Sequence, residues 1–310
     1  MMKIFAVAGS VFVLALVSSA ERLPQGPPPP MQGVRQNVAG MDENHPVLMS
    51  YRKAIVEMKK LPATNPLSWQ FQANMHGALN MDGANDAWRW CMHGNWYFLP
   101  WHRGYIYYFE KIVRKMSGDD GFRLPYWAWE TEGQNALPAP FRQKQYNGMV
   151  NVFFDGTRVK AANSGMPLRP DDQSGSFATD WQNVRGVSQF TTSFAALSYG
   201  GLRVDKTMIP KRPVSMDHGA MESQAHDLIH DAVGDDTGNM GDPDTAARDP
   251  IFWLHHANVD RLWNRWRDIA GHINPDRVAD KDWYDQEFPF YDENGKQVVV
   301  SVSKILELAE

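Results

Sequence analysis

Six of the ten histidines fall into two groups of three, a pattern that suits metal binding. The first group is His76, His93 and His102, and the second is His226, His230 and His256. Imidazole suits Zn, Cu, Fe and Ni, and the absence of regularly placed Asp or Glu disfavours iron–carboxylate sites. Three imidazoles on one ion leave a coordination position open, which is typical of reactive metal sites. The groups therefore predict two equivalent metal ions, and the alternative is a set of ordinary core or surface histidines.

Helices are needed to bring these histidines together. His226 and His230 are four residues apart, so a helix over 217–233 would place both imidazoles on one face. An acidic residue followed by proline is a strong helix start, and it predicts a helix over 249–269 that carries His256. The two helices would supply the second group of ligands.

The rest of the chain indicates a mainly α fold with long loops and a few short β-strands. Periodic apolar residues and proline starts predict further helices over 45–60, 65–80 and 100–116, the second of them capped by its first residue, an asparagine. Residues 133–215 are rich in Gly, Pro, Ser, Asn and Asp, which favours ordered loops. An Asn-Gly turn between two apolar runs predicts a hairpin over 288–302.

Composition narrows the class of protein. The chain has 310 residues, 43% hydrophobic and 22% charged, which is typical of a globular protein. The net charge of −5 argues against a nucleic-acid binder, which would usually be strongly basic. A single cysteine cannot form an intramolecular disulfide, so the core must hold the fold together.

The N-terminus has the pattern of an export signal. Residues 1–20 combine a lysine, a short apolar run and small residues, which predicts a signal peptide cleaved near Ala20; an uncleaved anchor helix is the alternative. Residues 21–33 read as a Pro-rich linker, followed by one domain over 34–310. We therefore expect a secreted or periplasmic protein with no stable membrane insertion.

Two long motifs resemble those of a known family. CMHGNWYFLPWHR at 91–103 is similar to the first copper motif of tyrosinases, polyphenol oxidases and molluscan-type haemocyanins, and DPIFWLHHANVDRLW at 249–263 is similar to the second. The resemblance extends to LPYWAWE at 124–130 and to the predicted hairpin. It implies a four-helix bundle enclosing a dinuclear copper site. The residues that match the ligands of the first copper are His76, His93 and His102, and those of the second are His226, His230 and His256.

The resemblance also implies roles for residues beside the ligands. In fungal and molluscan members the spacing of Cys91 and His93 accompanies a thioether bond; an unmodified buried cysteine is the alternative. His255 would point about 100° away from His256 and so lie beside the site without binding metal. Asp260 is one turn further on, where it could orient an imidazole N–H or form a salt bridge with an arginine.

Three further residues bear on the reaction. Glu222 matches a glutamate credited with activating a water in plant-like members; a solvated helix charge is the alternative. Asp227 stands where many monophenol-active members have Asn, which puts hydroxylation of monophenols in doubt more than oxidation of diphenols. Pro243 stands where plant-like members often have a bulky Phe, so we expect an open entrance. The histidines that match no ligand position and are expected to be ordinary are His45, His218 and His272.

The implied function is that of a copper-dependent oxidase. Two copper ions exchange two electrons, the number that a catechol gives up on becoming an o-quinone. We therefore expect a secreted enzyme that oxidises o-diphenols with dioxygen, with monophenol hydroxylation left open. The alternatives are a haemocyanin-like reversible dioxygen carrier and an o-aminophenol oxidase. The expected partners are small phenols and dioxygen, a copper-loading protein is left open, and no C-terminal lid domain is expected.

Overall fold

The computed structural model describes residues 33–77, 85–168, 199–205 and 218–308. Contacts join Gln32–Glu310 into one unit. The expected signal peptide, and all but the last residue of the expected linker, lie outside the described residues. Within the part that the structure describes, no helix has both the length and the apolar character needed to cross a bilayer.

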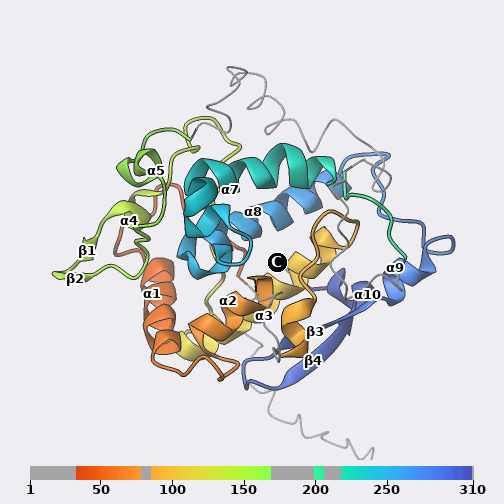
Figure 1. Cartoon of the computed structure of the whole chain (residues 1–310), viewed down its shortest axis with the longest axis horizontal. Coiled ribbons are helices and arrows are strands. Elements are labelled where there is room, and N and C mark those ends of the chain that lie inside the picture. The colour runs from red at the N-terminus through yellow and green to blue at the C-terminus, as the bar shows by residue number, and fades with distance from the viewer. Residues whose placement is uncertain (1–32, 78–84, 169–198, 206–217, 309–310) are drawn as a thin grey trace, which may run out of the picture. The chain divides into compact units, whose positions relative to one another are not determined.

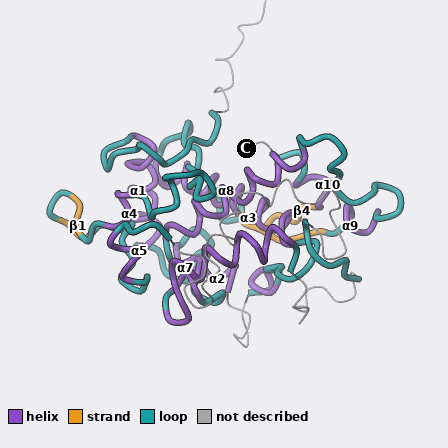
Figure 2. The backbone as a smooth tube through the Cα atoms, turned by 90° about the horizontal axis from the view of Figure 1, so that it is seen from above, coloured by secondary structure: helices purple, strands orange, loops and turns teal. Residues whose placement is uncertain are grey.

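Four helices form the centre of this unit (Figure 1). They are α2 (Trp69–Gly77), α3 (Phe98–Ser117), α7 (Asp227–Gly234) and α8 (Pro250–Arg267). The π-helical segment η3 (Glu222–His226) runs directly into α7. Helices account for most of the regular structure in the described residues, and strands are few and short (Figure 2). The expected mainly α fold around a helix bundle is confirmed.

Shorter elements surround the bundle. Helix α1 packs against α3, η6 packs against α2, and η5 packs against α7. These elements are α1 (Pro46–Lys59), η1 (Asp86–Arg89), α4 (Ala139–Arg142), α5 (Lys160–Ser164), η4 (Asp235–Thr237), η5 (Asn239–Gly241), η6 (Ala246–Arg248), α9 (Lys281–Asp285) and α10 (Val302–Ile305).

Helix α8 begins where the sequence predicts. The Asp249 side chain accepts a hydrogen bond from the backbone N–H of Ile251 at 3.0 Å, which caps the helix. The same carboxylate forms two hydrogen bonds to Arg158, at 2.6 and 2.7 Å, and both side chains are fully buried. The start of α8 is therefore fixed from outside the helix as well as from within it. The helix ends at Arg267, two residues before the expected end.

Helix α2 begins later than expected, because a different residue caps it. The side chain of Asn65 accepts a hydrogen bond from the backbone N–H of Leu67, which closes a turn of its own. Ser68 then accepts a hydrogen bond from the N–H of Phe71 at 3.0 Å and serves as the N-cap. The prediction that Asn65 caps this helix was wrong.

The C-terminal hairpin is confirmed. Strand β3 (Glu287–Tyr291) pairs with β4 (Gln297–Ser301) in antiparallel register, with Phe288 opposite Val300. The hairpin packs on α3, where a Cβ added to Gly104 would lie 2.6 Å from the ring of Phe290. Glycine is therefore required at that point of α3 for the two elements to touch.

The loop-rich stretch predicted over 133–215 is described only in part. It holds α4, α5 and a second small hairpin of β1 (Gln145–Tyr146) and β2 (Met149–Val150). Residues 169–198 and 206–217 lie outside the described part of the chain. The described remainder agrees with the expected loops and short strands.

Candidate metal centre

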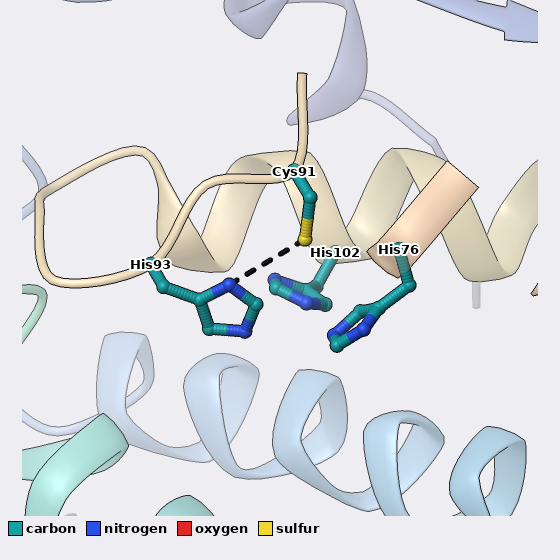
Figure 3. A group of neighbouring side chains, drawn as sticks. All are labelled: His76, Cys91, His93 and His102. Atoms are coloured by element: carbon teal, nitrogen blue, oxygen red, sulfur yellow. Dashed lines mark hydrogen bonds between the residues drawn. The ribbon is translucent and has the colours of Figure 1, made fainter. Parts of the chain in front are cut away.

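The first three histidines meet from three separate elements (Figure 3). His76 lies near the end of α2, His93 on the loop before α3, and His102 on α3. Their ring centroids are 5.0 to 5.5 Å apart. One nitrogen of each ring and the sulfur of Cys91 all lie within 4.8 Å of one another. Atoms this close could bind one metal ion.

The second group also converges. The group comprises two residues from η3 and α7, His226 and His230, and two neighbours on α8, His255 and His256. One nitrogen of each ring lies within 4.8 Å of the others. The Nε2 atoms of His226 and His256 are 3.3 Å apart, so these two imidazoles aim their ring nitrogens at the same point. His255 is fully buried beside them, with its ring 5.1 Å from that of His226.

The two groups adjoin. The rings of His102 and His256 stack with their centroids 4.4 Å apart and their planes 8° from parallel. Since one residue comes from α3 and the other from α8, the contact between these helices joins the groups into one centre.

Hydrogen bonds fix which nitrogen of each ring faces the centre. The Nδ1 atoms of His76, His102 and His230 lie 2.6 to 2.8 Å from backbone carbonyl oxygens. A carbonyl only accepts hydrogen bonds, so each Nδ1 carries the proton and each Nε2 keeps a lone pair. This is the arrangement in which histidine ligands are normally held to metals.

The donor set fits metal ions. The Nε2 atoms of His102 and His230 are buried and have no hydrogen-bond partner among the described residues, as expected of atoms meant for a metal. Burial lowers the pKa of His102 to about 3, and it also lowers the pKa values of His226, His230 and His256. These rings are therefore neutral at physiological pH, which is the form that binds metal.

The position of His76 depends on a close approach between the end of α2 and the loop at residues 243–244. The carbonyl that holds His76 belongs to Pro243, whose side chain is at the surface. A Cβ added to Gly77 would lie 2.3 Å from the Cα of Asp244. Glycine after His76 thus lets the end of α2 press against the loop that orients the imidazole.

Cys91 lies against His93. Its sulfur is 3.5 Å from Nδ1 of that imidazole, and the cysteine is 1% exposed (Figure 3). The two side chains are thus in contact, and the thioether bond between them stays a prediction.

Glu222 is buried at the junction of the two groups. Its two carboxylate oxygens lie 2.9 and 3.0 Å from the backbone N–H of Gly94, which donates to them from the residue after His93. The side chain is only 1% exposed, so the alternative of a solvated helix charge does not apply. Glu222 therefore ties the loop of the first group to the helix of the second.

Asp227 bridges two histidines, one of which the sequence reasoning treated as ordinary. Its Oδ1 lies 2.8 Å from Nδ1 of His226, and its Oδ2 lies 2.7 Å from Nδ1 of His218. His218 is four residues before Glu222 on the expected helix, and that spacing was the signal that could have drawn attention to it.

Asp260 forms ion pairs with arginines. Its oxygens lie 3.1 Å from Arg35 and 2.5 Å from Arg103, and all three side chains are buried. This is the salt bridge that the sequence left as one of two roles. The pairs join α8 to α3 beside His102, so Asp260 positions helices and not an imidazole.

Sequence comparison places the chain in a family. The model described as the common central domain of tyrosinase matches residues 66–269, which include both groups of histidines. The chain belongs to the tyrosinase family. A second model, the polyphenol oxidase middle domain, matches residues 277–310, which include the C-terminal hairpin.

Named relatives in this family are bacterial and plant proteins. The tyrosinase HcTyr1 of Hahella sp. (strain CCB-MM4) is 34% identical over 87% of this chain and 60% of its own length. The chloroplastic polyphenol oxidase of Vitis vinifera is 34% identical over 85% of this chain and 44% of its own length. The chain thus spans about half the length of the curated relatives it matches.

Solved tyrosinase-family structures share the fold. Grenache (Vitis vinifera) polyphenol oxidase aligns with a TM-score of 0.70 at 30% identity, over 88% of this chain and 81% of the other. Latent apple tyrosinase aligns with a TM-score of 0.73 at 27% identity, over 89% of this chain and 61% of the other. The family is one of type-3 dicopper proteins, and the histidine groups of this chain fit two copper ions.

Proposed function

We propose that this chain binds two copper ions and oxidises o-diphenols to o-quinones with dioxygen. The observation that carries the proposal is the convergence of six imidazoles, from α2, the loop before α3, α3, η3, α7 and α8, on one centre. In this proposal His76, His93 and His102 hold one copper, and His226, His230 and His256 hold the other. The bound copper pair supplies the two-electron redox chemistry that the oxidation of a catechol requires.

The residues around the pair have roles of their own. The carbonyls opposite Nδ1 hold the imidazoles in place, and His255 fills space beside the second copper ion. A catechol must lose its hydroxyl protons to bind copper and be oxidised. We assign this step to Glu222, a buried carboxylate beside both groups that can take the proton through a water, while Asp227 holds the ring of His226.

The carboxylate of Asp227 favours diphenol oxidation over monophenol hydroxylation. Both of its oxygens are engaged by histidines, so it is not free to turn toward a water as an asparagine amide could. We therefore expect slow turnover of tyrosine-like monophenols and faster turnover of catechols.

Two further assignments belong to this proposal. Pro243 leaves the entrance open to sizeable phenols, because a rigid, small ring replaces a bulky aromatic side chain next to the loop that holds His76. Residues 1–20 direct export of the chain, and N-terminal sequencing of the mature protein tests this by locating the cleavage near Ala20.

The decisive experiment compares three substrates on copper-loaded full-length chain. Quinone formation from a catechol, without activators, is expected to exceed that from a tyrosine-like monophenol, and an o-aminophenol is run in parallel. A protein that binds dioxygen reversibly but forms no quinone would be a carrier, and this result would overturn the proposal. Faster oxidation of the o-aminophenol than of the catechol would reassign the substrate.

Substitution of one proposed copper ligand tests whether catechol oxidation depends on the histidine centre. His256→Ala is expected to bind about one copper ion fewer per chain and to lose catechol oxidation. The matched control is His45→Ala, because His45 lies before α1 and outside both groups. Equal loss in the two variants would contradict the assigned ligands.

A further inference from the structure

His226 differs from the other ligands in what holds it. Three of the imidazoles have Nδ1 against a backbone carbonyl, which cannot move independently of the fold. His226 has Nδ1 against the side chain of Asp227, 2.8 Å away. A carboxylate carries a full negative charge, so it makes a stronger, charge-assisted hydrogen bond than a carbonyl. It is also a side chain that can rotate.

Asp227 needs a second contact to keep its orientation. About a third of its side chain is exposed, so water competes for its oxygens. Its other oxygen, Oδ2, lies 2.7 Å from Nδ1 of His218, whose side chain is exposed to a similar extent. The carboxylate is thus held from both sides, with one oxygen on the metal ligand and the other on His218.

His218 is placed for this contact by the start of the same helical run. It lies four residues before the π-helical segment begins at Glu222, and its imidazole contacts Asp227 nine residues along the chain. Its Nδ1 is also 3.7 Å from Oε1 of the buried Glu222, so the imidazole lies between two carboxylates. The two contacts hold the imidazole of His218 next to the second group of histidines.

We propose that His218 is a positioning residue that fixes Asp227 and, through it, the ring orientation and tautomer of His226. The proposal rests on the dicopper function above and adds a determinant of copper binding at the second group. With Asp227 fixed, the Nδ1 proton of His226 stays on the carboxylate side, and Nε2 keeps its lone pair for the copper ion. Partners of this kind typically contribute 10- to 100-fold to metal affinity.

Two substitutions of His218 distinguish the effect of its hydrogen bond to Asp227 from the effect of its side-chain volume. In His218→Asn the side-chain amide nitrogen occupies the place of Nδ1 and can still donate to Asp227. His218→Leu has similar bulk and cannot donate. Copper is titrated into full-length protein in competition with a chromophoric chelator. We expect His218→Leu to bind one of the two ions about tenfold more weakly, the low end of the typical range. His218→Asn should bind both ions close to the wild-type level.

A double-mutant comparison and a measurement without copper complete the test. Adding His218→Leu to Asp227→Leu should weaken copper binding no further, because the two residues act in series. In copper-free protein, ¹⁵N NMR of the imidazoles should show His226 as the Nδ1–H tautomer in wild type and as a mixture in His218→Leu.

Three results would overturn the proposal. These are wild-type copper affinity in His218→Leu, equal losses in His218→Leu and His218→Asn, or an unchanged His226 tautomer. If the wild type itself holds fewer than two copper ions, the proposed function fails. In that case the NMR comparison on copper-free protein still decides the role of His218.

Discussion

Five of the six proposed ligand rings have a partner at the nitrogen Nδ1. Carbonyls hold His76, His102 and His230, a carboxylate holds His226, and a sulfur lies next to Nδ1 of His93. In these five rings Nε2 is then the nitrogen that can bind copper. Ligand geometry here depends on loops and side chains outside the metal-binding set.

The contact of Cys91 with His93 predicts a covalent bond in the copper-loaded protein. Forming a thioether removes one hydrogen from sulfur and one from the ring, with dioxygen as the oxidant that accepts them. We expect the tryptic peptide containing both residues to be lighter than its sequence mass by two hydrogen atoms. Mass spectrometry of protein purified with copper measures this.

The control for that measurement is Cys91→Ser, which should show the full sequence mass. A wild-type peptide at the full mass, with the cysteine open to alkylation after unfolding, would instead indicate an unmodified buried thiol.

The sequence identifies the histidines that converge in the structure, and most of them lie in local motifs. The spacing of His226 and His230 fits one face of a helix, which is a weak signal alone, and ordered motifs surround His93, His102 and His256. The four-residue spacing of His218 and Glu222 was a weak signal, whereas the hydrogen bond from Gly94 to Glu222 joins residues 128 apart and could not be foreseen. Chain-distant contacts of this kind leave no periodic signal.

At the scale of elements, α8 is the helix on which the centre most depends. It carries His255 and His256, and its start is held by the buried pair of Asp249 and Arg158. The sequence predicted its cap, because an acidic residue before proline is a local signal. The arginine, 91 residues away, was not predictable in the same way.

Breaking the buried pair should destabilise the fold severely. Asp249→Asn keeps an oxygen for the helix cap but leaves Arg158 as an uncompensated buried charge. We expect a loss of about 3–5 kcal/mol in the free energy of unfolding. Urea unfolding of copper-free protein measures it.

The matched control is Asp285→Asn, which breaks a surface pair with Lys281 in which both side chains are more than half exposed. Surface pairs contribute about 0–1 kcal/mol. Similar losses in the two variants would mean that the pair at the start of α8 is not an anchor.

On the scale of the whole molecule, a cluster of neutral histidines makes the copper-free protein sensitive to acid. Burial lowers the pKa values of His102, His226, His230, His255 and His256 in the folded state. In the unfolded chain these groups titrate near pH 6.5. Below that pH the unfolded state binds more protons than the folded state, so stability falls as pH falls.

We therefore expect the free energy of unfolding of copper-free protein to be lower at pH 5.5 than at pH 7.5. Each histidine adds at most about 1.4 kcal/mol per pH unit. Urea unfolding at the two pH values measures the difference, and copper loading should raise stability at both. Unchanged or greater stability at pH 5.5 would show that these imidazoles are not held neutral by the fold.

Residues near the C-terminus of the chain pack against the segment that carries His93 and His102. The indole N–H of Trp283 donates to the backbone carbonyl of Trp96 at 2.9 Å, and the ring of Phe290 covers α3 at Gly104. The segment that carries His93 and His102 therefore has no complete support until more than 180 further residues have been synthesised. We therefore expect the proposed copper centre to reach its final geometry only after Trp283 and Phe290 have been added to the growing chain.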